Sequence, residues 1–177
     1  MHFLNNGKHA LVFPARCGTR WIAEKLYNNK ILNTLGPHHR FEWDDSGYDV
    51  EIFMFVRNPF IRERSIYRWF AETGQITFEN CSFEDYVNSN MFHEIGSWYT
   101  EYGDLNNRVQ HIHLENINDF LKEKFDIADE YDNSYHMADD GLNDATMFGS
   151  SQVVDTILLK YQEDLKHIQF DLTNYTV

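Results

Sequence analysis

The residues best suited to chemistry stand together in the segment VRNPFIRERSIY, residues 56–67, which follows a short apolar run. The run predicts a buried strand that delivers Arg57 to its carboxyl end, and Asn58 with Pro59 predicts a helix start, as N-cap and first helical residue. Backbone N–H groups and the helix dipole favour an anion there, and an arginine with the Ser65 hydroxyl suits a phosphate. The segment therefore predicts a phosphate site at a strand-to-helix junction.

A second candidate for anion binding is the loop PARCGTRW, residues 14–21, which follows another apolar stretch. Gly18 permits close approach of the backbone and Thr19 stands at the entrance of the next helix, so the loop suits a phosphate-like group. It lacks the GxxxxGK[ST] pattern of an ATP-binding P-loop, and no magnesium-type carboxylate accompanies it. A cysteine-phosphatase loop would need an arginine six positions after Cys17, where the chain has Ala23, so nucleophilic catalysis by this cysteine fails on spacing.

Alternating apolar runs and amphipathic stretches predict the elements that position these residues, in an α/β fold with a largely parallel sheet. We expect strands at 9–14, 31–35, 52–56 and 109–114, helices at 19–29, 58–72, 83–88, 116–125 and 150–167, and a loop over 126–143. In such sheets ligands bind outside the carboxyl ends of the strands. Both arginine-bearing junctions lie at such ends, so we expect them to face one ligand from two sides.

Length and composition fit one globular domain over residues 1–177. The chain is 42% hydrophobic and 16% aromatic, and its formal charge of −13 argues against a broad nucleic-acid-binding surface. It has no run of about 18 apolar residues and no signal-like N-terminus, so we expect neither a membrane span nor export. Its two cysteines, Cys17 and Cys81, show no disulfide framework and no metal-type spacing, which is typical of a reduced, cytoplasmic protein without a metal centre.

The segment from Arg57 to Tyr67 resembles the 3′-phosphate-binding motif of the sulfotransferase superfamily, whose sulfuryl donor is 3′-phosphoadenosine 5′-phosphosulfate (PAPS). In the carbohydrate sulfotransferases the motif runs R-x-P-x-x-R-x-x-S-x-Y, and this chain matches it with Arg57, Pro59, Arg62, Ser65 and Tyr67. The resemblance implies a P-loop-like three-layer fold, with a mostly parallel central sheet flanked by helices. It also implies that Arg57 and Ser65 hold the 3′-phosphate of the donor.

The loop at residues 14–21 is then similar to the 5′-phosphosulfate loop of the family, P-K-x-G-T or R-K-x-G-T. The resemblance implies that donor contacts in this loop come from Arg16, Cys17, Gly18, Thr19, Arg20 and Trp21. Trp21 or Phe148 would pack near the adenine. Arg16 stands in place of the usual lysine, and an inserted Ala15 shifts the alignment by one position. An arginine can stabilise charge on the leaving phosphate with two hydrogen bonds, but it does not donate a proton as lysine can.

Transfer of a sulfuryl group to a hydroxyl also needs a base near the acceptor. The family uses His or Glu after the first helix and second strand, and that region here contains His38, His39 and Glu42. We rank His39 first, because histidine has a suitable unperturbed pKa. Glu42 comes second, since burial would have to raise its pKa, and His38 comes third.

The resemblance as a whole implies a metal-free, PAPS-dependent sulfotransferase acting on a hydroxyl of a carbohydrate or small polar molecule, with adenosine 3′,5′-bisphosphate as the second product. Two alternatives stay open. One is a PAPS-binding protein without transferase activity, because Arg16 replaces lysine, and the other, less favoured, is a P-loop-like small-molecule kinase. The chain is short for the family, so we leave open whether the acceptor site is open, shared with a second subunit of a homo-oligomer, or shaped by the loop over 126–143.

Overall fold

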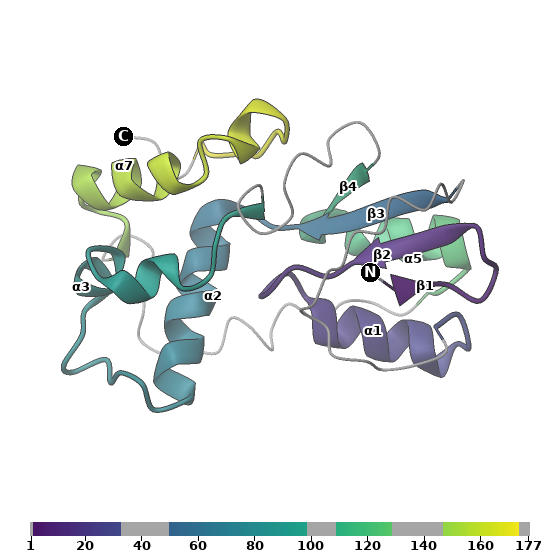
Figure 1. Ribbon diagram of the computed structural model, residues 1–177, viewed down its shortest axis with the longest axis horizontal. Helices are drawn as coiled ribbons and strands as arrows, with labels where there is room; N and C mark the ends of the chain where they lie inside the picture. The colour runs from purple at the N-terminus through teal and green to yellow at the C-terminus, as the bar shows by residue number, and fades with distance from the viewer. Residues whose placement is uncertain (1, 33–49, 99–108, 129–146, 174–177) are drawn as a thin grey trace. The chain divides into compact units, whose positions relative to one another are not determined.

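The computed structural model describes residues 2–32, 50–98, 109–128 and 147–173, whose path is drawn in Figure 1. The chain divides into two compact units, each built from two separate stretches: Met1–Arg57 with Asp104–Tyr131, and Asn58–Gly103 with Asp132–Val177. The boundary therefore passes between Arg57 and Asn58, inside the predicted phosphate motif. That the whole of 1–177 acts as one domain stays a prediction.

The first unit contains a four-stranded sheet with the order β1-β2-β3-β4. The short strand β1 (His2–Phe3) is antiparallel to β2 (His9–Val12), whereas β2, β3 (Glu51–Val56) and β4 (Val109–His113) are parallel. The α/β class and the parallel sheet predicted from the sequence are confirmed. Because these three strands run in one direction, their carboxyl ends lie at one edge of the sheet.

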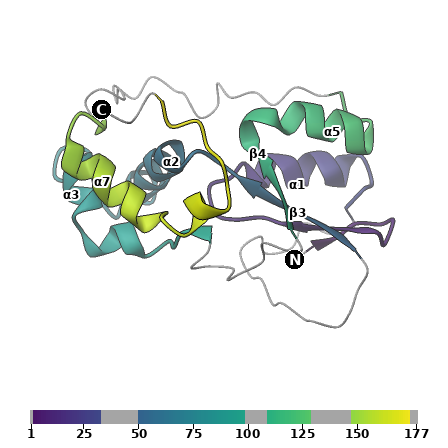
Figure 2. The ribbon, with the colours of Figure 1, turned by 90° about the horizontal axis from the view of Figure 1, so that it is seen from above.

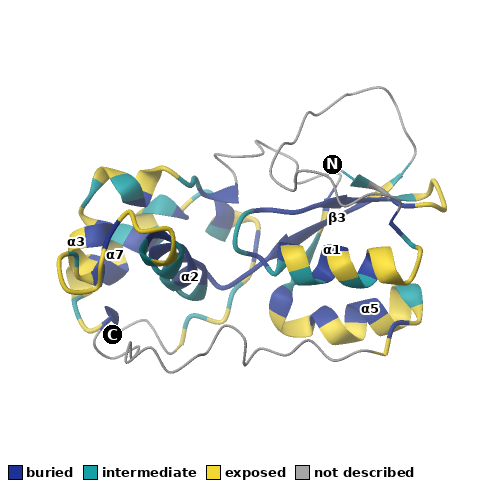
Figure 3. Cartoon of the chain, turned by 90° about the horizontal axis from the view of Figure 1, so that it is seen from below, coloured by how far each residue is buried: buried dark blue, intermediate teal, exposed yellow. Residues whose placement is uncertain are grey.

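Two helices accompany the sheet, α1 (Thr19–Asn28) and α5 (Ile117–Phe125). Figures 2 and 3 show both of them on the same side of the strands. The contact is apolar and aromatic: the ring of Phe120 on α5 meets the ring of Phe53 on β3 edge to face, with 5.0 Å between centroids. A second helical layer is not among the described elements, so the three-layer arrangement is not confirmed.

The second unit is helical in its described part. It comprises α2 (Pro59–Glu72), α3 (Phe83–Val87), α7 (Ser151–Lys160) and the 3-10 turns η1 (Asn90–His93) and η4 (Asp164–Lys166). The helix α2 packs against both α3 and α7. Eight of its 14 residues are buried, which makes α2 the central helix of this unit.

Local sequence signals account for where these helices begin. The side chain of Asn58 accepts a hydrogen bond from the Phe60 N–H at 3.0 Å, and Pro59 takes the first helical position of α2, as predicted. At α3, Ser82 and Asp85 form a capping box, in which each side chain bonds to the backbone N–H of the other residue. The two helix starts are therefore fixed by residues within a few positions of them.

Two predicted elements differ from the structure. The predicted strand over 31–35 is absent at Ile31 and Leu32, and its other residues lie outside the described ones. The long helix predicted over 150–167 ends at Lys160 and is followed by the turn η4. The apolar stripe suggested one continuous helix, but the polar side chain of Asp164 is itself buried, and the chain tightens into the 3-10 turn that contains it.

Candidate functional site

In the first unit, the loop at residues 14–21 and Arg57 meet at the carboxyl edge of the sheet. The loop follows β2, Arg57 follows β3, and these strands are parallel neighbours. The guanidinium of Arg57, only 7% exposed as a residue, donates a hydrogen bond from Nη1 to the carbonyl oxygen of Arg16 at 3.5 Å. The two arginine-bearing junctions are thus adjacent, as expected from their positions at strand ends.

The loop has a backbone shape that few residues adopt. Gly18 is the N-cap of α1 with a left-handed φ of 69°, and Arg16 is also left-handed, with φ 63°. A non-glycine residue in this region is uncommon, and such strain is found preferentially at functional sites. Nothing in the sequence indicated the conformation of Arg16.

Gly18 is also required by its neighbour. A Cβ atom added to Gly18 would lie 2.6 Å from Cδ1 of Leu114, which belongs to the 3-10 turn η2 (Leu114–Asn116) directly after β4. Contacts under about 3.0 Å are not found for real Cβ atoms. The end of a third strand therefore packs against the loop, and only glycine fits without movement.

The side chain of Thr19 bonds to the backbone of the same loop. Its buried hydroxyl donates to the carbonyl oxygen of Pro14 at 2.8 Å, and the N–H of Cys17 donates to the same oxygen at 3.4 Å. The single hydroxyl proton of Thr19 is therefore used within the loop, and contact of this side chain with a phosphate as a donor would require that bond to open. The Thr19 backbone N–H remains the more suitable donor, because the first N–H groups of a helix have no partner within it.

The remaining predicted residues of the loop differ in their exposure. Cys17 is fully buried, so a ligand would meet its backbone rather than its thiol. The side chain of Arg20 is 90% exposed and pairs along the helix with Glu24 at 3.1 Å. Trp21 is half-buried, with the Lys25 ammonium 5.5 Å from its ring centroid. The helix start, with its backbone N–H groups, is thus the part of this loop best suited to meet an anion.

In the second unit, α2 carries the rest of the motif. Ser65 is 8% exposed, whereas Arg62 is fully buried and its Nη1 donates to the Gly96 carbonyl oxygen at 2.8 Å. The hydroxyl of Tyr67 donates to the Cys81 carbonyl oxygen at 2.6 Å, and burial raises the pKa of Tyr67 to about 12. Arg62 and Tyr67 therefore hold the helix in place. Arg57 and Ser65 belong to different units.

Arg62 is part of a buried polar group that the sequence did not predict. We call it the Glu63 cluster, and it consists of Arg62, Glu63, Tyr86, Lys160 and Tyr161. Glu63 is fully buried and accepts three hydrogen bonds from the other members. Burial raises the pKa values of Tyr86 and Tyr161, and the negative charge of Glu63 adds to both shifts, so both phenols stay protonated as donors. These residues come from distant parts of the chain, which is why no local pattern indicated them.

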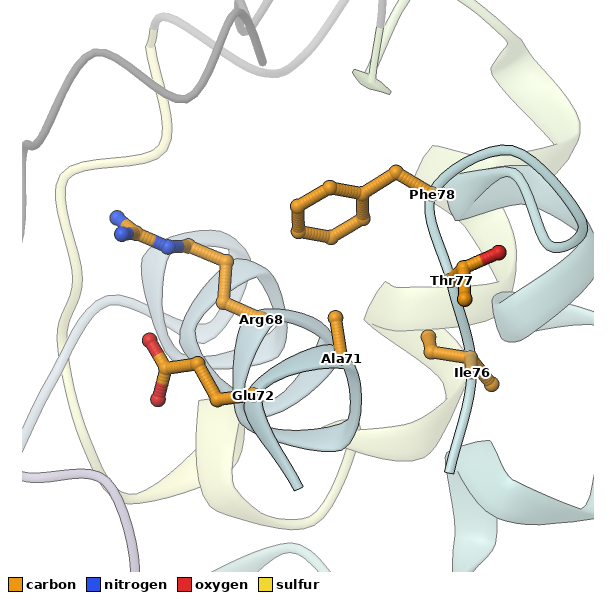
Figure 4. A pocket seen from close by; sticks show the side chains of 6 residues that line it. All are labelled: Arg68, Ala71, Glu72, Ile76, Thr77 and Phe78. Atoms are coloured by element: carbon orange, nitrogen blue, oxygen red, sulfur yellow. The ribbon is translucent and has the colours of Figure 1, made fainter. Parts of the chain in front are cut away.

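A pocket of about 350 Å³ also lies in the second unit, lined by Arg68, Ala71, Glu72, Ile76, Thr77 and Phe78. Figure 4 shows the ring of Phe78 extending over it, while the charged ends of Arg68 and Glu72 lie on the far side from Ile76 and Thr77. None of the residues predicted to contact the donor lines this pocket.

The residues predicted as the base, His38, His39 and Glu42, lie outside the described residues. Among the residues that the structure does describe, no three His, Cys, Asp or Glu side chains are grouped so that they could hold a metal ion. Within the same part of the chain, no helix has the length and apolar character needed to cross a membrane.

No family model, no curated protein and no solved structure matches this chain. A function for it is therefore proposed from its own residues.

Proposed function

We propose that this protein is a PAPS-dependent sulfotransferase. The observation that carries the proposal is the match of residues 57–67 to the 3′-phosphate motif at all five of its defined positions. The local structure supports it, because Arg57 follows a buried parallel strand and Asn58 caps the helix that carries Ser65. The P-loop-like three-layer fold that the resemblance implies belongs to the same proposal.

In this proposal the donor lies along the carboxyl edge of the sheet. Arg57 and Ser65 hold the 3′-phosphate, and the loop at 14–21 holds the 5′-phosphosulfate. The support for the second part is the start of α1 at Gly18, where the helix dipole and the N–H groups of the first turn favour an anion. The guanidinium of Arg57 bonds to the Arg16 carbonyl oxygen, so its positive charge lies beside this loop.

The reaction would be a direct in-line displacement. The acceptor hydroxyl oxygen bonds to sulfur while the bond from sulfur to the bridging phosphate oxygen breaks, and adenosine 3′,5′-bisphosphate leaves. Arg16 and the α1 N–H groups stabilise the charge that develops on the leaving phosphate. The hydroxyl proton passes to the base, for which His39 ranks first, then Glu42, then His38.

The acceptor in this proposal is a carbohydrate or another small polar molecule that carries a hydroxyl. The formal charge of −13 disfavours nucleic acid as a partner. A cytoplasmic location and a homo-oligomeric state belong to the same proposal.

One alternative has a specific observation in its favour. Arg16 replaces the lysine of the family and holds a left-handed backbone conformation, so the loop could bind the donor without supporting transfer. Transfer of labelled sulfate from PAPS to a panel of hydroxyl acceptors separates the two functions, because a binding protein produces no labelled product. Labelled product with any acceptor would establish the enzyme.

The proposal is tested first by binding. Adenosine 3′,5′-bisphosphate is expected to raise the melting temperature more than ADP or AMP does, because only it carries a 3′-phosphate. Arg57→Ala is expected to remove this preference, with a loss of about ten- to a hundredfold in affinity for the bisphosphate, since a hydrogen bond to a charged group contributes about 1.5–3 kcal/mol.

The matched control is Lys8→Ala, which removes one exposed positive charge of the same unit just before β2, at the opposite edge of the sheet. It should leave the preference unchanged. Equal melting shifts for the three nucleotides on the wild-type protein would refute the proposal.

A further inference from the structure

The helix α2 carries two adjacent opposite charges, Arg62 and Glu63, both fully buried. Taking a charge out of water is unfavourable unless its partners are supplied inside the protein. Here they are supplied, and they come from three other parts of the second unit. What these partners fix is the position of α2.

Glu63 is held from two other helices. Its Oε1 accepts from Lys160 Nζ at 2.6 Å and from the Tyr161 hydroxyl at 2.6 Å, both at the end of α7. Its Oε2 accepts from the Tyr86 hydroxyl of α3 at 2.7 Å. A carboxylate lies about 6 Å from the helix axis, so a rotation of α2 by roughly 20° would move it about 2 Å and break bonds of this length. The three bonds therefore fix the rotation of α2.

Arg62 ties the same helix to a third segment. Its Nη1 donates to the Gly96 carbonyl oxygen at 2.8 Å and to the Tyr161 hydroxyl at 2.9 Å, and its guanidinium lies 4.8 Å from the centroid of the Trp98 ring. The Tyr161 hydroxyl thus accepts from Arg62 and donates to Glu63. Lys160 extends the chain of bonds to the carbonyl oxygen of Phe92 in η1, at 2.6 Å.

Ser65 lies next to this cluster on the same helix. It follows Arg62 by three residues, so the two side chains are neighbours on one face of α2, about 4.5 Å apart along the axis. A regular helical turn is stiff, and any rotation of α2 at Arg62 therefore moves Ser65 by a similar angle. The bonds that hold Arg62 and Glu63 therefore also set the angle around the helix axis at which Ser65 leaves α2.

Stability alone does not account for such a cluster. Buried ionic groups contribute little net stability compared with apolar side chains of similar size, whereas they can select one arrangement over others. We propose that the Glu63 cluster is a positioning device, which sets the rotation of α2 so that Ser65 meets the 3′-phosphate of the donor. This inference rests on the proposed function, and its residues are positioning residues without contact to the donor.

The test measures selectivity rather than stability. Dissociation constants of the intact protein for adenosine 3′,5′-bisphosphate and for ADP are determined by calorimetry, for the wild type and for Lys160→Met, and their ratio is compared. The ratio should fall at least tenfold in the variant, because a displaced Ser65 weakens only the contact to the 3′-phosphate. A role confined to stability would lower the melting temperature and leave the ratio unchanged.

Two further variants complete the design. Tyr161→Phe removes only the hydroxyl that links Arg62 with Glu63, keeps the ring, and decides the question if Lys160→Met does not fold. Lys166→Met removes an exposed lysine that pairs with Glu163 at 2.7 Å, and it should leave the ratio at the wild-type value.

The outcomes are distinct. A wild-type ratio near one overturns the proposed function, and this inference with it. A selective wild type whose folded Lys160→Met and Tyr161→Phe variants keep the full ratio overturns the positioning role alone. A selective wild type with a reduced ratio in a folded cluster variant, and an unchanged ratio in Lys166→Met, supports both.

Discussion

Replacing Gly18 by alanine is expected to destabilise the protein by about 2–5 kcal/mol, through two costs that can be separated. The first is the backbone: at a φ of 69° an L-residue pays about 1–2 kcal/mol. The second is steric, because the new Cβ would lie 2.6 Å from Cδ1 and 3.3 Å from Cδ2 of Leu114. Forcing an extra methyl into packed surroundings typically costs about 1–3 kcal/mol.

The structure offers a matched control at Gly7. Its φ is 64°, but nothing lies within 4 Å of an added Cβ, so Gly7→Ala carries the backbone cost alone, about 1–2 kcal/mol. The measurement is urea unfolding of both variants. With a slope of about 2 kcal/mol per molar urea, Gly18→Ala should lower the midpoint by about 1–2.5 M and Gly7→Ala by about 0.5–1 M.

A double-mutant cycle isolates the contact itself. Leu114→Ala alone leaves a cavity and should cost about 2–5 kcal/mol. Combined with Gly18→Ala it makes room for the new methyl, so the double variant should be more stable than the sum of the single variants implies, by about 1–2 kcal/mol. If Gly18→Ala costs no more than Gly7→Ala, or if the cycle shows no coupling, the packing of the β4 end against the loop is refuted.

Three further predictions concern ionisable groups of the second unit and the thiols. The phenol of Tyr67 is expected to ionise near pH 12, because burial raises its pKa to about 12. The difference between the ultraviolet pH titrations of the wild type and of Tyr67→Phe measures this ionisation, and a value near pH 10 would contradict it. Hydrogen bonds from Ser82 lower the pKa of Asp85, so the folded state binds fewer protons than the unfolded state. The ionised Asp85 therefore stabilises the fold above the unfolded pKa of about 4, and this stabilisation is lost as pH falls through the folded pKa. In urea unfolding from about pH 5 downward, the free energy of unfolding of Asp85→Asn should therefore decrease less with falling pH than that of the wild type. The same decrease in both proteins would count against the capping box. Cys17 is buried, whereas Cys81 is half-buried and its pKa is raised mainly by burial. A thiol reagent at neutral pH should therefore label Cys81 slowly in the native protein and Cys17 only on unfolding. Rapid labelling of both thiols in the native protein would disagree with the structure.

Much of the local structure could be predicted because its causes are local. Asn58 with Pro59, and Ser82 with Asp85, start helices through bonds that span two or three residues. Where the cause is distant, prediction failed. The apolar stripe continued past Lys160, but the structure places the buried polar residue Asp164 in a separate 3-10 turn. Hydrophobic periodicity does not contain that information.

The candidate site divides in the same way. The parallel arrangement of β2 and β3 was enough to predict that Arg57 and the loop after β2 would be neighbours. It was not enough to predict that the Thr19 hydroxyl bonds to Pro14 instead of facing outward, because that bond depends on the folded shape of the loop. The pairing of Arg20 with Glu24 could have been predicted from their spacing of four residues on a helix. The family resemblance instead assigned Arg20 to the donor site.

The interleaved path of the chain has a consequence for how the protein is made. Each unit combines an earlier and a later stretch of sequence, and strand β4 can join β3 only after residues up to His113 have been added. During synthesis β3 therefore leaves the ribosome with one edge unpaired while the whole stretch Asn58–Gly103 is still being added. At about 5–20 residues per second this exposure lasts for several seconds, and neither unit can be produced alone as one uninterrupted fragment.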